Sequence, residues 1–301
     1  MAKVFIDGSA GTTGLRIYER LEHRKDIELI RLPDHLRKDT SARQQALEQA
    51  DIAFLCLPDD AAREAVGLIT NDTTAVIDTS TAHRTAADWV YGMPELTGQR
   101  EKIVASKRIA NPGCHAGGFI ALVAPLVQAG VIDAGEKLSC FSLTGYSGGG
   151  KKMIAQYEDG EQPLLKAPRM YGLGQSHKHL PEMQQICGLT YAPVFCPVVA
   201  PFYAGMQVTV PLTDVDPEVV KNVYRSYYTN GLIRFSEAEE DGFLSATALE
   251  GKDNMTVSVF GNKQRLTLVA RFDNLGKGAS GAAVQNMNLL LGVAETTGLN
   301  I

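Results

Sequence analysis

The chain has 301 residues, of which 45% are hydrophobic and 21% are charged, and its formal net charge is -5. This balance is typical of a globular protein with two domains or one large α/β unit. The negative charge argues against a general nucleic-acid binder, which needs a basic face, and no apolar run approaches the roughly 20 residues of a membrane-spanning helix.

The first part of the chain alternates strands with helices. Apolar runs predict strands over 3–7, 27–32, 52–57 and 75–78, and amphipathic stretches predict helices over 15–24, 41–50 and 59–68. The first residues, one lysine before a strand and a glycine turn, are not typical of a signal peptide. Strands alternating with helices imply right-handed parallel crossovers, and therefore a Rossmann-type doubly wound α/β sheet.

The character of the chain changes after Cys114. Longer strands with fewer helices between them are predicted over 138–143, 192–199, 206–211, 255–261 and 265–272, and an apolar helix over 280–292 closes the chain. This pattern indicates a second α+β domain with a mostly antiparallel sheet. We therefore predict a dinucleotide-binding domain over 1–114 plus 279–301, and a catalytic and oligomerisation domain over 115–278.

A glycine turn joins the first strand to the first helix, with glycines at positions 8, 11 and 14. Such glycines let the backbone approach a pyrophosphate whose charge sits at the helix N-terminus, although the spacing departs from the common GxGxxG and also suits a plain turn. Arg31 stands near the end of the second strand, with Arg37 and Lys38 beyond it. Basic groups there favour the 2′-phosphate of NADP, the alternative being solvated loop charges.

Cys114 follows the turn Asn111-Pro112-Gly113 and precedes an apolar helix over 119–128. In the first turn of that helix, the dipole and the free N–H groups would stabilise a thiolate and an oxyanion on the carbon it attacks. The alternative is a small hydrophobic residue packed at a helix start. The other four cysteines lie in apolar surroundings and are interpreted as core residues: Cys56, Cys140, Cys187 and Cys196. Scattered cysteines without a CxxC pair favour the reducing cytoplasm.

A candidate base lies in the segment 174–182. His177 and His179 are separated by one residue and would face the same side if the segment were extended. Histidine suits proton transfer near neutral pH, and Glu182 follows where it can orient an imidazole. A metal site is the alternative reading of two such histidines, but the spacing shows no third set of ligands. The roles of His83 and His115 stay open, and His115 most simply flanks the cysteine turn.

Together these motifs resemble the short form of the N-acetyl-γ-glutamyl-phosphate reductases, the arginine-pathway branch of the semialdehyde-dehydrogenase superfamily. The resemblance covers nearly the whole chain. Besides the glycine turn with Thr12, Thr13 and Gly14, the matching segments are 78–84 (DTSTAHR), 91–96 (YGMPEL), 111–114 (NPGC), 145–150 (GYSGGG), 177–182 (HKHLPE), 274–279 (NLGKGA) and 283–288 (AVQNMN).

The resemblance implies roles at these positions. It implies Cys114 as nucleophile and His179 as general acid/base, with His177 and Glu182 beside it. It places Asn286 near the nicotinamide and the glycine turn around the cofactor, NADPH. It implies that Arg84 holds an anionic group of the substrate and that the 145–150 loop, with Ser147 and Gly148, lines the acyl site. The alternatives are a surface salt bridge for Arg84, a flexible hairpin for the loop and a packing or capping role for Asn286.

The resemblance implies that a homo-oligomer, a dimer or tetramer, uses NADPH and no metal to reduce a small-molecule acyl phosphate through a thioester on Cys114. The expected substrate is N-acetyl-γ-glutamyl phosphate, and the expected products are N-acetylglutamate 5-semialdehyde and phosphate. Three alternatives stay open: β-aspartyl phosphate as substrate, a cysteine-histidine hydrolase or acyltransferase without nicotinamide, and a catalytically silent NADPH sensor. The segment Thr81-Ala82-His83 departs from the acidic-aromatic pair that longer relatives carry.

Overall fold

A computed structural model describes residues 1–160 and 162–301 of the chain. Its contacts divide the chain into two compact units, which we call the nucleotide unit (1–113 and 279–299) and the thiol unit (114–278 and 300–301). Cys114, placed at the end of the first domain in the sequence analysis, groups here with the thiol unit, because it begins a helix of that unit.

The nucleotide unit is built on a parallel sheet, as predicted. Within the described residues the sheet has six strands in the order β2-β1-β3-β4-β6-β5. Their bounds are β1 (Ala2–Asp7), β2 (Ile27–Ile30), β3 (Ile52–Leu55), β4 (Ala75–Asp78), β5 (Val90–Tyr91) and β6 (Arg108–Ala110). Because β2 and β3 lie on opposite sides of β1, the chain reverses direction across the sheet at the carboxyl end of β1, where such folds bind ligands.

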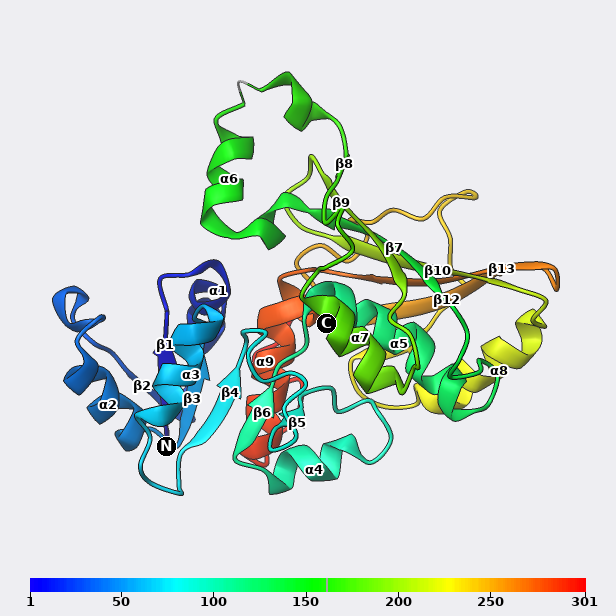
Figure 1. Cartoon of the computed structure of the whole chain (residues 1–301). Helices are drawn as coiled ribbons and strands as arrows, with labels where there is room; N and C mark the ends of the chain where they lie inside the picture. The colour runs from blue at the N-terminus through cyan, green and yellow to red at the C-terminus, as the bar shows by residue number, and fades with distance from the viewer. Residues whose placement is uncertain (161) are drawn as a thin grey trace. The chain divides into compact units, whose positions relative to one another are not determined.

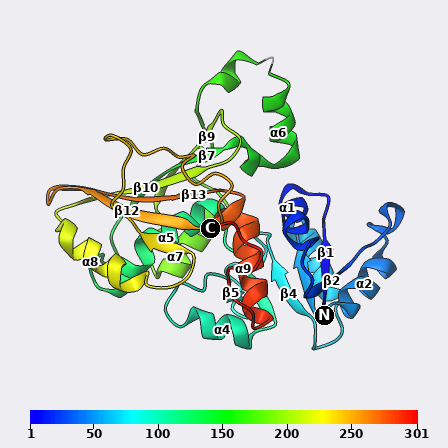
Figure 2. The same cartoon turned by 180° about the vertical axis from the view of Figure 1, so that it is seen from behind.

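Helices cover both faces of this sheet (Figure 1). One core holds Val4 and Ile6 of β1 against α1 (Thr12–Leu21), α4 (Gln99–Ala105) and α9 (Gly281–Leu290), and Figure 2 shows α9 beside α4. The other core holds Phe5 against α2 (Thr40–Gln49) and α3 (Asp59–Gly67). Since successive side chains of a strand point to opposite faces, burial of both sets explains why these strands are continuous apolar runs.

The bounds of several elements differ from the predicted ones. Helix α1 begins at Thr12 rather than at residue 15, because glycine at position 14 packs inside the first turn instead of preceding the helix. Strand β2 ends at Ile30, so Arg31 follows the strand directly. The sequence did not predict helices α4, α6 (Gly150–Glu158), α7 (His179–Cys187) and α8 (Pro217–Tyr227). It also did not predict the short strands β5, β6, β8 (Arg169–Met170) and β11 (Ile233–Phe235).

The thiol unit contains a mixed sheet. Among the described residues it has seven strands in the order β11-β12-β13-β10-β7-β9-β8. Most neighbours are antiparallel, as expected, whereas β7 pairs with β9 and β11 with β12 in parallel. The bounds are β7 (Ser139–Gly145), β8 (Arg169–Met170), β9 (Val194–Ala200), β10 (Met206–Thr213), β11 (Ile233–Phe235), β12 (Met255–Gly261) and β13 (Arg265–Phe272).

Helices α5 (Cys114–Gln128) and α8 (Pro217–Tyr227) pack against that sheet. Helix α5 contacts β10, β13 and both α7 and α8 (Figure 1). On β7 and β9 the side chains of Phe141 and Val194 are instead more than half exposed, which leaves an apolar face of these strands uncovered. Cys196 lies on this face and is half-buried, so the prediction that it is a core residue is wrong. Cys140 and Cys187 are buried, and Cys56 is half-buried after β3 but packs against the core of the nucleotide unit, as predicted.

The segment carrying His177 and His179 is not extended. Lys178 has helical backbone angles and His179 begins α7, so the two histidines do not alternate as in a strand. Within the described part of the chain, no helix combines the length and apolar character needed to cross a membrane.

Candidate active site

The glycine turn brings the end of β1 against the end of β3. Gly8 has φ +86°, and a Cβ there would collide with the carbonyl oxygen of Cys56. A Cβ at Gly14 would lie 2.5 Å from the carbonyl oxygen of Gly8 and 2.9 Å from the Cα of Ser9. The turn is therefore a cradle that side chains would fill, which is the use of glycine where backbone must approach a ligand.

The first turn of α1 presents unused hydrogen-bonding groups. The N-cap residue Gly11 has no side chain with which to cap the helix. The hydroxyl oxygen of Thr12 is buried and finds no hydrogen-bond partner among the described residues, whereas Thr13 is half-buried beside it. The N–H groups of a first helical turn lack intrahelical acceptors. Such donors at a helix N-terminus are chemically suited to an anion.

A pocket of about 930 Å³ lies beside the glycine turn, within the nucleotide unit. Arg31, Arg37 and Lys38 line it together with Gly8. Arg37 is paired with Asp34 at 2.7 Å, whereas in the described structure neither Arg31 nor Lys38 has an acidic partner. The Arg31 guanidinium lies over the Tyr18 ring, 5.0 Å from its centroid. The pocket thus offers two uncompensated cations to an anionic ligand.

Arg43 lines this pocket and is paired with two carboxylates, those of Asp7 and Glu64. The sequence analysis did not single out Arg43. The Arg43 Nη2 donates to Asp7 Oδ2 at 2.9 Å, and its Nη1 lies 3.1 Å from Glu64 Oε1. Burial raises the pKa of Asp7, while the Arg43 guanidinium opposes that rise. The pair fixes the last residue of β1 immediately before the glycine turn. No local sequence pattern predicts the Arg43–Asp7 pair, because α2 and β1 come together only when the chain folds.

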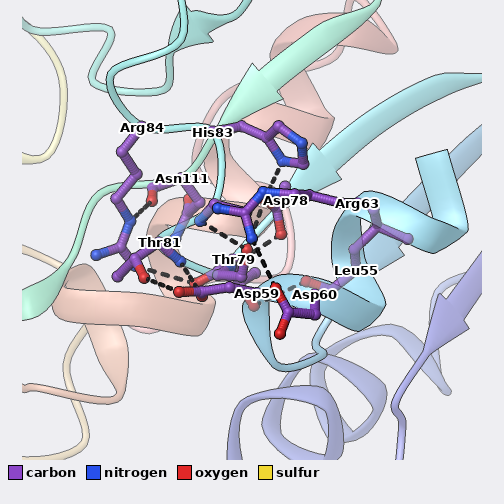
Figure 3. A network of polar contacts seen from close by, with 12 residues as sticks. Leu55, Asp59, Asp60, Arg63, Asp78, Thr79, Thr81, His83, Arg84 and Asn111 are labelled. Carbon is purple, nitrogen blue, oxygen red and sulfur yellow. Dashed lines mark hydrogen bonds and ion pairs between the residues drawn. The ribbon is translucent and has the colours of Figure 1, made fainter. Parts of the chain in front are cut away.

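The end of β4 carries a buried polar network (Figure 3). The Asp78 carboxylate is fully buried and contacts His83 Nδ1 at 2.6 Å, and the His83 ring stacks on Trp89. Arg84 is buried too; its Nε donates to the Asn111 carbonyl at 2.9 Å and its Nη2 to the Thr79 carbonyl at 3.0 Å. Arg84 is therefore not a surface residue. Its two hydrogen bonds connect the end of β4 to Asn111, the first residue of the cysteine turn.

Asn286 is fully buried in the nucleotide unit. Its Nδ2 donates to the Gly92 carbonyl at 2.9 Å and to Asn111 Oδ1 at 3.3 Å, while its Oδ1 finds no partner in the described residues. A Cβ at Gly92 would lie 2.5 Å from the Asn286 amide nitrogen, so glycine permits this approach. The arrangement leaves one buried acceptor available for a donor group of a ligand.

In the thiol unit, Cys114 is the first residue of α5 and is half-buried. A π-helical turn, Gly276–Ser280, passes close to it: a Cβ at Gly278 would lie 3.0 Å from the Cβ of Cys114. Single π-turns are frequent at functional sites. A helix N-terminus is the position where a thiolate is stabilised by the dipole and by free N–H groups.

Three histidines gather beside this helix start. The buried ring of His115 lies 5.7 Å from that of His177 and 5.6 Å from that of His179, between ring centroids, and the latter two rings are 4.8 Å apart. Folding thus brings both predicted bases next to the residue that follows Cys114. Glu182, in the first turn of α7, is almost fully buried.

His115 also contacts two residues that sequence reasoning missed. Its Nδ1 lies 2.6 Å from the hydroxyl of Ser142 on β7, and its Nε2 lies 2.7 Å from the hydroxyl of Tyr171, which follows β8. Residues 115 and 171 are far apart in the chain, and nothing in the local sequence links them.

The predicted acyl-site loop is a helical turn rather than a hairpin. Residues Tyr146–Gly149 form a 3₁₀ turn that leads into α6. Ser147 is buried and its Oγ accepts from Asn274 Nδ2 at 2.9 Å, whereas Gly148 is exposed. Asn274 holds this turn in place, since its Oδ1 also accepts from Gly205 N at 3.0 Å. A search of the described residues finds no group of three acidic, cysteine or histidine side chains suited to a metal ion.

Comparison with known proteins identifies the relatives of this chain. Residues 3–105 match the family described as "Semialdehyde dehydrogenase, NAD binding domain", and residues 114–274 match "Semialdehyde dehydrogenase, dimerisation domain". The chain is 45% identical to N-acetyl-gamma-glutamyl-phosphate reductase 2 of Nostoc sp. over 99% of both chains. It is 47% identical to N-acetyl-gamma-glutamyl-phosphate reductase of Brucella suis, over 96% of this chain and 99% of that one.

The chain belongs to the N-acetyl-gamma-glutamyl-phosphate reductase family. This membership confirms the predicted resemblance, and the NAD binding domain confirms an enzyme that uses a nicotinamide cofactor. The fold of the family also occurs in aspartate semialdehyde dehydrogenase II from Vibrio cholerae, with a TM-score of 0.74 and 19% identity over 97% of this chain and 98% of that one. At that identity the likeness concerns the fold alone.

Proposed function

We propose that this protein reduces N-acetyl-γ-glutamyl phosphate to N-acetylglutamate 5-semialdehyde and phosphate, with NADPH, in arginine biosynthesis. The observation that carries the proposal is the start of α5, where Cys114 is half-buried and the next residue, His115, has ring contacts with both His177 and His179. The relatives at 45% and 47% identity bear the name of this reductase.

The residues of the nucleotide unit fit a dinucleotide. The cradle of Gly8, Gly11 and Gly14, with the unused Thr12 hydroxyl and the neighbouring Thr13, suits a pyrophosphate. Arg31 and Lys38 suit a 2′-phosphate, which is the reason to propose NADP rather than NAD. The unpartnered buried oxygen of Asn286 suits a carboxamide donor. When bound, NADPH supplies a hydride to the acyl carbon.

The thiol unit supplies covalent capture. The Cys114 thiolate attacks the acyl carbon, the C–O bond to phosphate breaks, and phosphate leaves to give a thioester. The N–H groups at the start of α5 stabilise the oxyanion that develops during the attack. His179 takes the proton of the thiol before attack and returns it when the C–S bond of the reduced adduct breaks and the aldehyde leaves. His177 and Glu182 orient that imidazole.

The remaining site residues are proposed to bind substrate. Arg84, held by the carbonyls of Thr79 and Asn111, would present its guanidinium to an anionic group, and Ser147 and Gly148 would line the acyl chain. The uncovered apolar face of β7 and β9 supports a homo-oligomer, dimer or tetramer, as does the name of the matching dimerisation domain. Free cysteines support a cytoplasmic location.

The test is a steady-state assay in the oxidative direction with N-acetylglutamate 5-semialdehyde, phosphate and NADP or NAD. We expect phosphate-dependent formation of reduced cofactor, faster with NADP. Absence of phosphate dependence would point to a different reaction and reject the proposal.

Aspartate semialdehyde is the matched alternative substrate, because the solved neighbours include aspartate semialdehyde dehydrogenases. In parallel assays the N-acetylglutamate compound should give the higher kcat/KM. A preference for the aspartate compound would reassign the substrate while leaving the thioester chemistry in place.

A further inference from the structure

Behind the start of α5, a serine, a histidine and a tyrosine form an unbroken chain of hydrogen bonds. Ser142 Oγ lies 2.6 Å from His115 Nδ1, and His115 Nε2 lies 2.7 Å from the Tyr171 hydroxyl. Ser142 is fully buried and His115 is 3% exposed, whereas Tyr171 is half-buried. All three belong to the thiol unit, on α5, on β7 and after β8.

The imidazole in the middle of this chain is neutral at physiological pH. Burial, with a smaller contribution from His177, lowers the pKa of His115 to about 3. A neutral imidazole has one N–H donor and one acceptor nitrogen. All three groups must therefore donate in the same direction, either from Ser142 toward Tyr171 or from Tyr171 toward Ser142.

The burial of Ser142 decides the direction. Among the described residues, His115 is the only hydrogen-bond partner of the Ser142 hydroxyl. If Tyr171 donated to His115 and His115 to Ser142, the serine proton would be left in the interior without an acceptor, which is unfavourable. If Ser142 donates to Nδ1, then Nε2–H donates to the Tyr171 oxygen, and the protons of the two buried residues, Ser142 and His115, both have acceptors.

The favoured direction leaves the tyrosine proton for a ligand. Its oxygen accepts from His115, and within the described structure its O–H has no other protein acceptor. Burial raises the pKa of Tyr171, and the charge of Cys114 raises it further, so the hydroxyl stays protonated at neutral pH. The Tyr171 hydroxyl lies 2.7 Å from His115, which directly follows Cys114 at the start of α5. The donor is therefore available where the acyl group will be attached.

We propose that Ser142 and His115 are positioning residues that orient the Tyr171 hydroxyl as a hydrogen-bond donor to the acyl oxygen of the group bound to Cys114. The proposal rests on the thioester chemistry proposed above. It makes Tyr171 a side-chain partner of the α5 N–H groups in stabilising the oxyanion, and it gives the buried His115 a function separate from that of His179.

The first test reads the tautomer of His115 directly in the wild-type protein. Nitrogen-15 NMR of ring-labelled histidine distinguishes a proton on Nε2 from a proton on Nδ1. We expect the Nε2–H tautomer at neutral pH, and a shift toward a tautomer mixture in Ser142→Ala. An Nδ1–H tautomer in the wild type would overturn the proposal, whatever the enzyme's activity.

The second test is kinetic. Tyr171→Phe removes one hydroxyl and should lower kcat roughly 100-fold with little change in KM, as expected for a lost oxyanion donor. Ser142→Ala should lower kcat in the same way but by less, and Ser142→Thr, which keeps a hydroxyl on a strand, should restore most of it. Matched controls are Tyr228→Phe, whose buried hydroxyl donates to Ala121, and Ser258→Ala, a buried serine of β12.

A third measurement separates the acyl oxygen from the thiolate as the acceptor. The rate of Cys114 alkylation against pH, followed by mass spectrometry without cofactor or substrate, should be the same in Tyr171→Phe and wild type. Wild-type kcat in Tyr171→Phe or in Ser142→Ala, or an alkylation profile shifted toward high pH, would overturn the proposal. A wild-type enzyme inactive on the N-acetylglutamate compound would instead reject the proposed function. The tautomer of His115 would still test the direction of the hydrogen-bond chain from Ser142 to Tyr171.

Discussion

The two units build their sites from different materials. In the nucleotide unit most of the candidate cofactor site consists of glycines, backbone N–H groups and exposed cations within the first 38 residues of the chain, and Asn286 of α9 is added to them. In the thiol unit the candidate catalytic site consists of buried and half-buried side chains from α5, α7, β7 and the segment between β8 and α7. The first site depends on the space that side chains leave, and the second on the contacts that side chains make.

This difference governs how each unit should respond to change. Adding atoms should damage the nucleotide site, because its cradle works by being empty. Removing polar atoms should damage the thiol site, because its donors and acceptors are buried and depend on one another. Substitutions in the nucleotide unit should therefore reduce cofactor affinity without affecting the thiol chemistry, and substitutions in the thiol unit should do the opposite.

The largest expected effect is the loss of the nucleophile. Cys114→Ser should lower kcat by roughly a thousandfold or more, because a hydroxyl at that position is a much weaker nucleophile. NADPH affinity, measured by fluorescence titration, should stay within about twofold of wild type. Near-normal turnover in this variant would reject the thioester mechanism.

The second prediction concerns acid stability. His115 has a pKa of about 3 when folded, against an ordinary value of 6.5, so the unfolded chain binds its proton first as pH falls. The free energy of unfolding contributed by the neutral imidazole is complete above pH 6.5 and is lost toward pH 3, by up to about 1.4 kcal/mol per pH unit. Urea unfolding at several pH values measures this slope.

His115→Gln should flatten that slope, because glutamine does not titrate in this range. The control is His23→Gln, which replaces an exposed histidine whose side chain is 89% accessible and should leave the slope unchanged. Equal slopes in wild type and His115→Gln would mean that the buried histidine does not cause the acid sensitivity.

The third prediction fills the cradle. Gly14→Ala places a Cβ 2.5 Å from the Gly8 carbonyl oxygen, so the turn must move. Overpacking of this kind costs about 1–3 kcal/mol, and NADPH affinity should fall roughly tenfold or more. Gly67→Ala, at the end of α3 where the added Cβ meets nothing within 4 Å, is the matched control and should leave affinity unchanged. Equal NADPH affinity in both variants would contradict a pyrophosphate at this turn.

The smallest expected effect concerns cofactor choice. Arg31→Ala should weaken NADPH binding roughly tenfold and leave NADH binding unchanged, because only the former carries the 2′-phosphate. Arg63→Ala, which removes an exposed arginine paired with Asp60, is the control. If Arg31→Ala weakened the binding of NADPH and NADH equally, Arg31 would not contact the 2′-phosphate. A different residue would then have to account for the preference for NADP.

Much of the nucleotide unit could be predicted because its signals are local. The alternation of apolar strands with helices and the glycines at 8, 11 and 14 stand next to one another in the chain. Arg43 was missed for the opposite reason: its partner Asp7 lies 36 positions away, and only the packing of α2 on β1 joins them. The predicted start of α1 is wrong because the prediction places Gly14 before the helix, whereas Gly14 lies inside it.

The amino-acid sequence by itself determined which groups the protein has: a cysteine after a turn, two histidines near an acid, and glycines between a strand and a helix. Only the tertiary structure decided that His115 is buried between Ser142 and Tyr171, and that both predicted bases lie against it. The physical reason is that hydrophobic periodicity reports which face of an element is buried but not which distant side chain meets it. A buried hydrogen-bond chain is a product of packing, and it has no local signature.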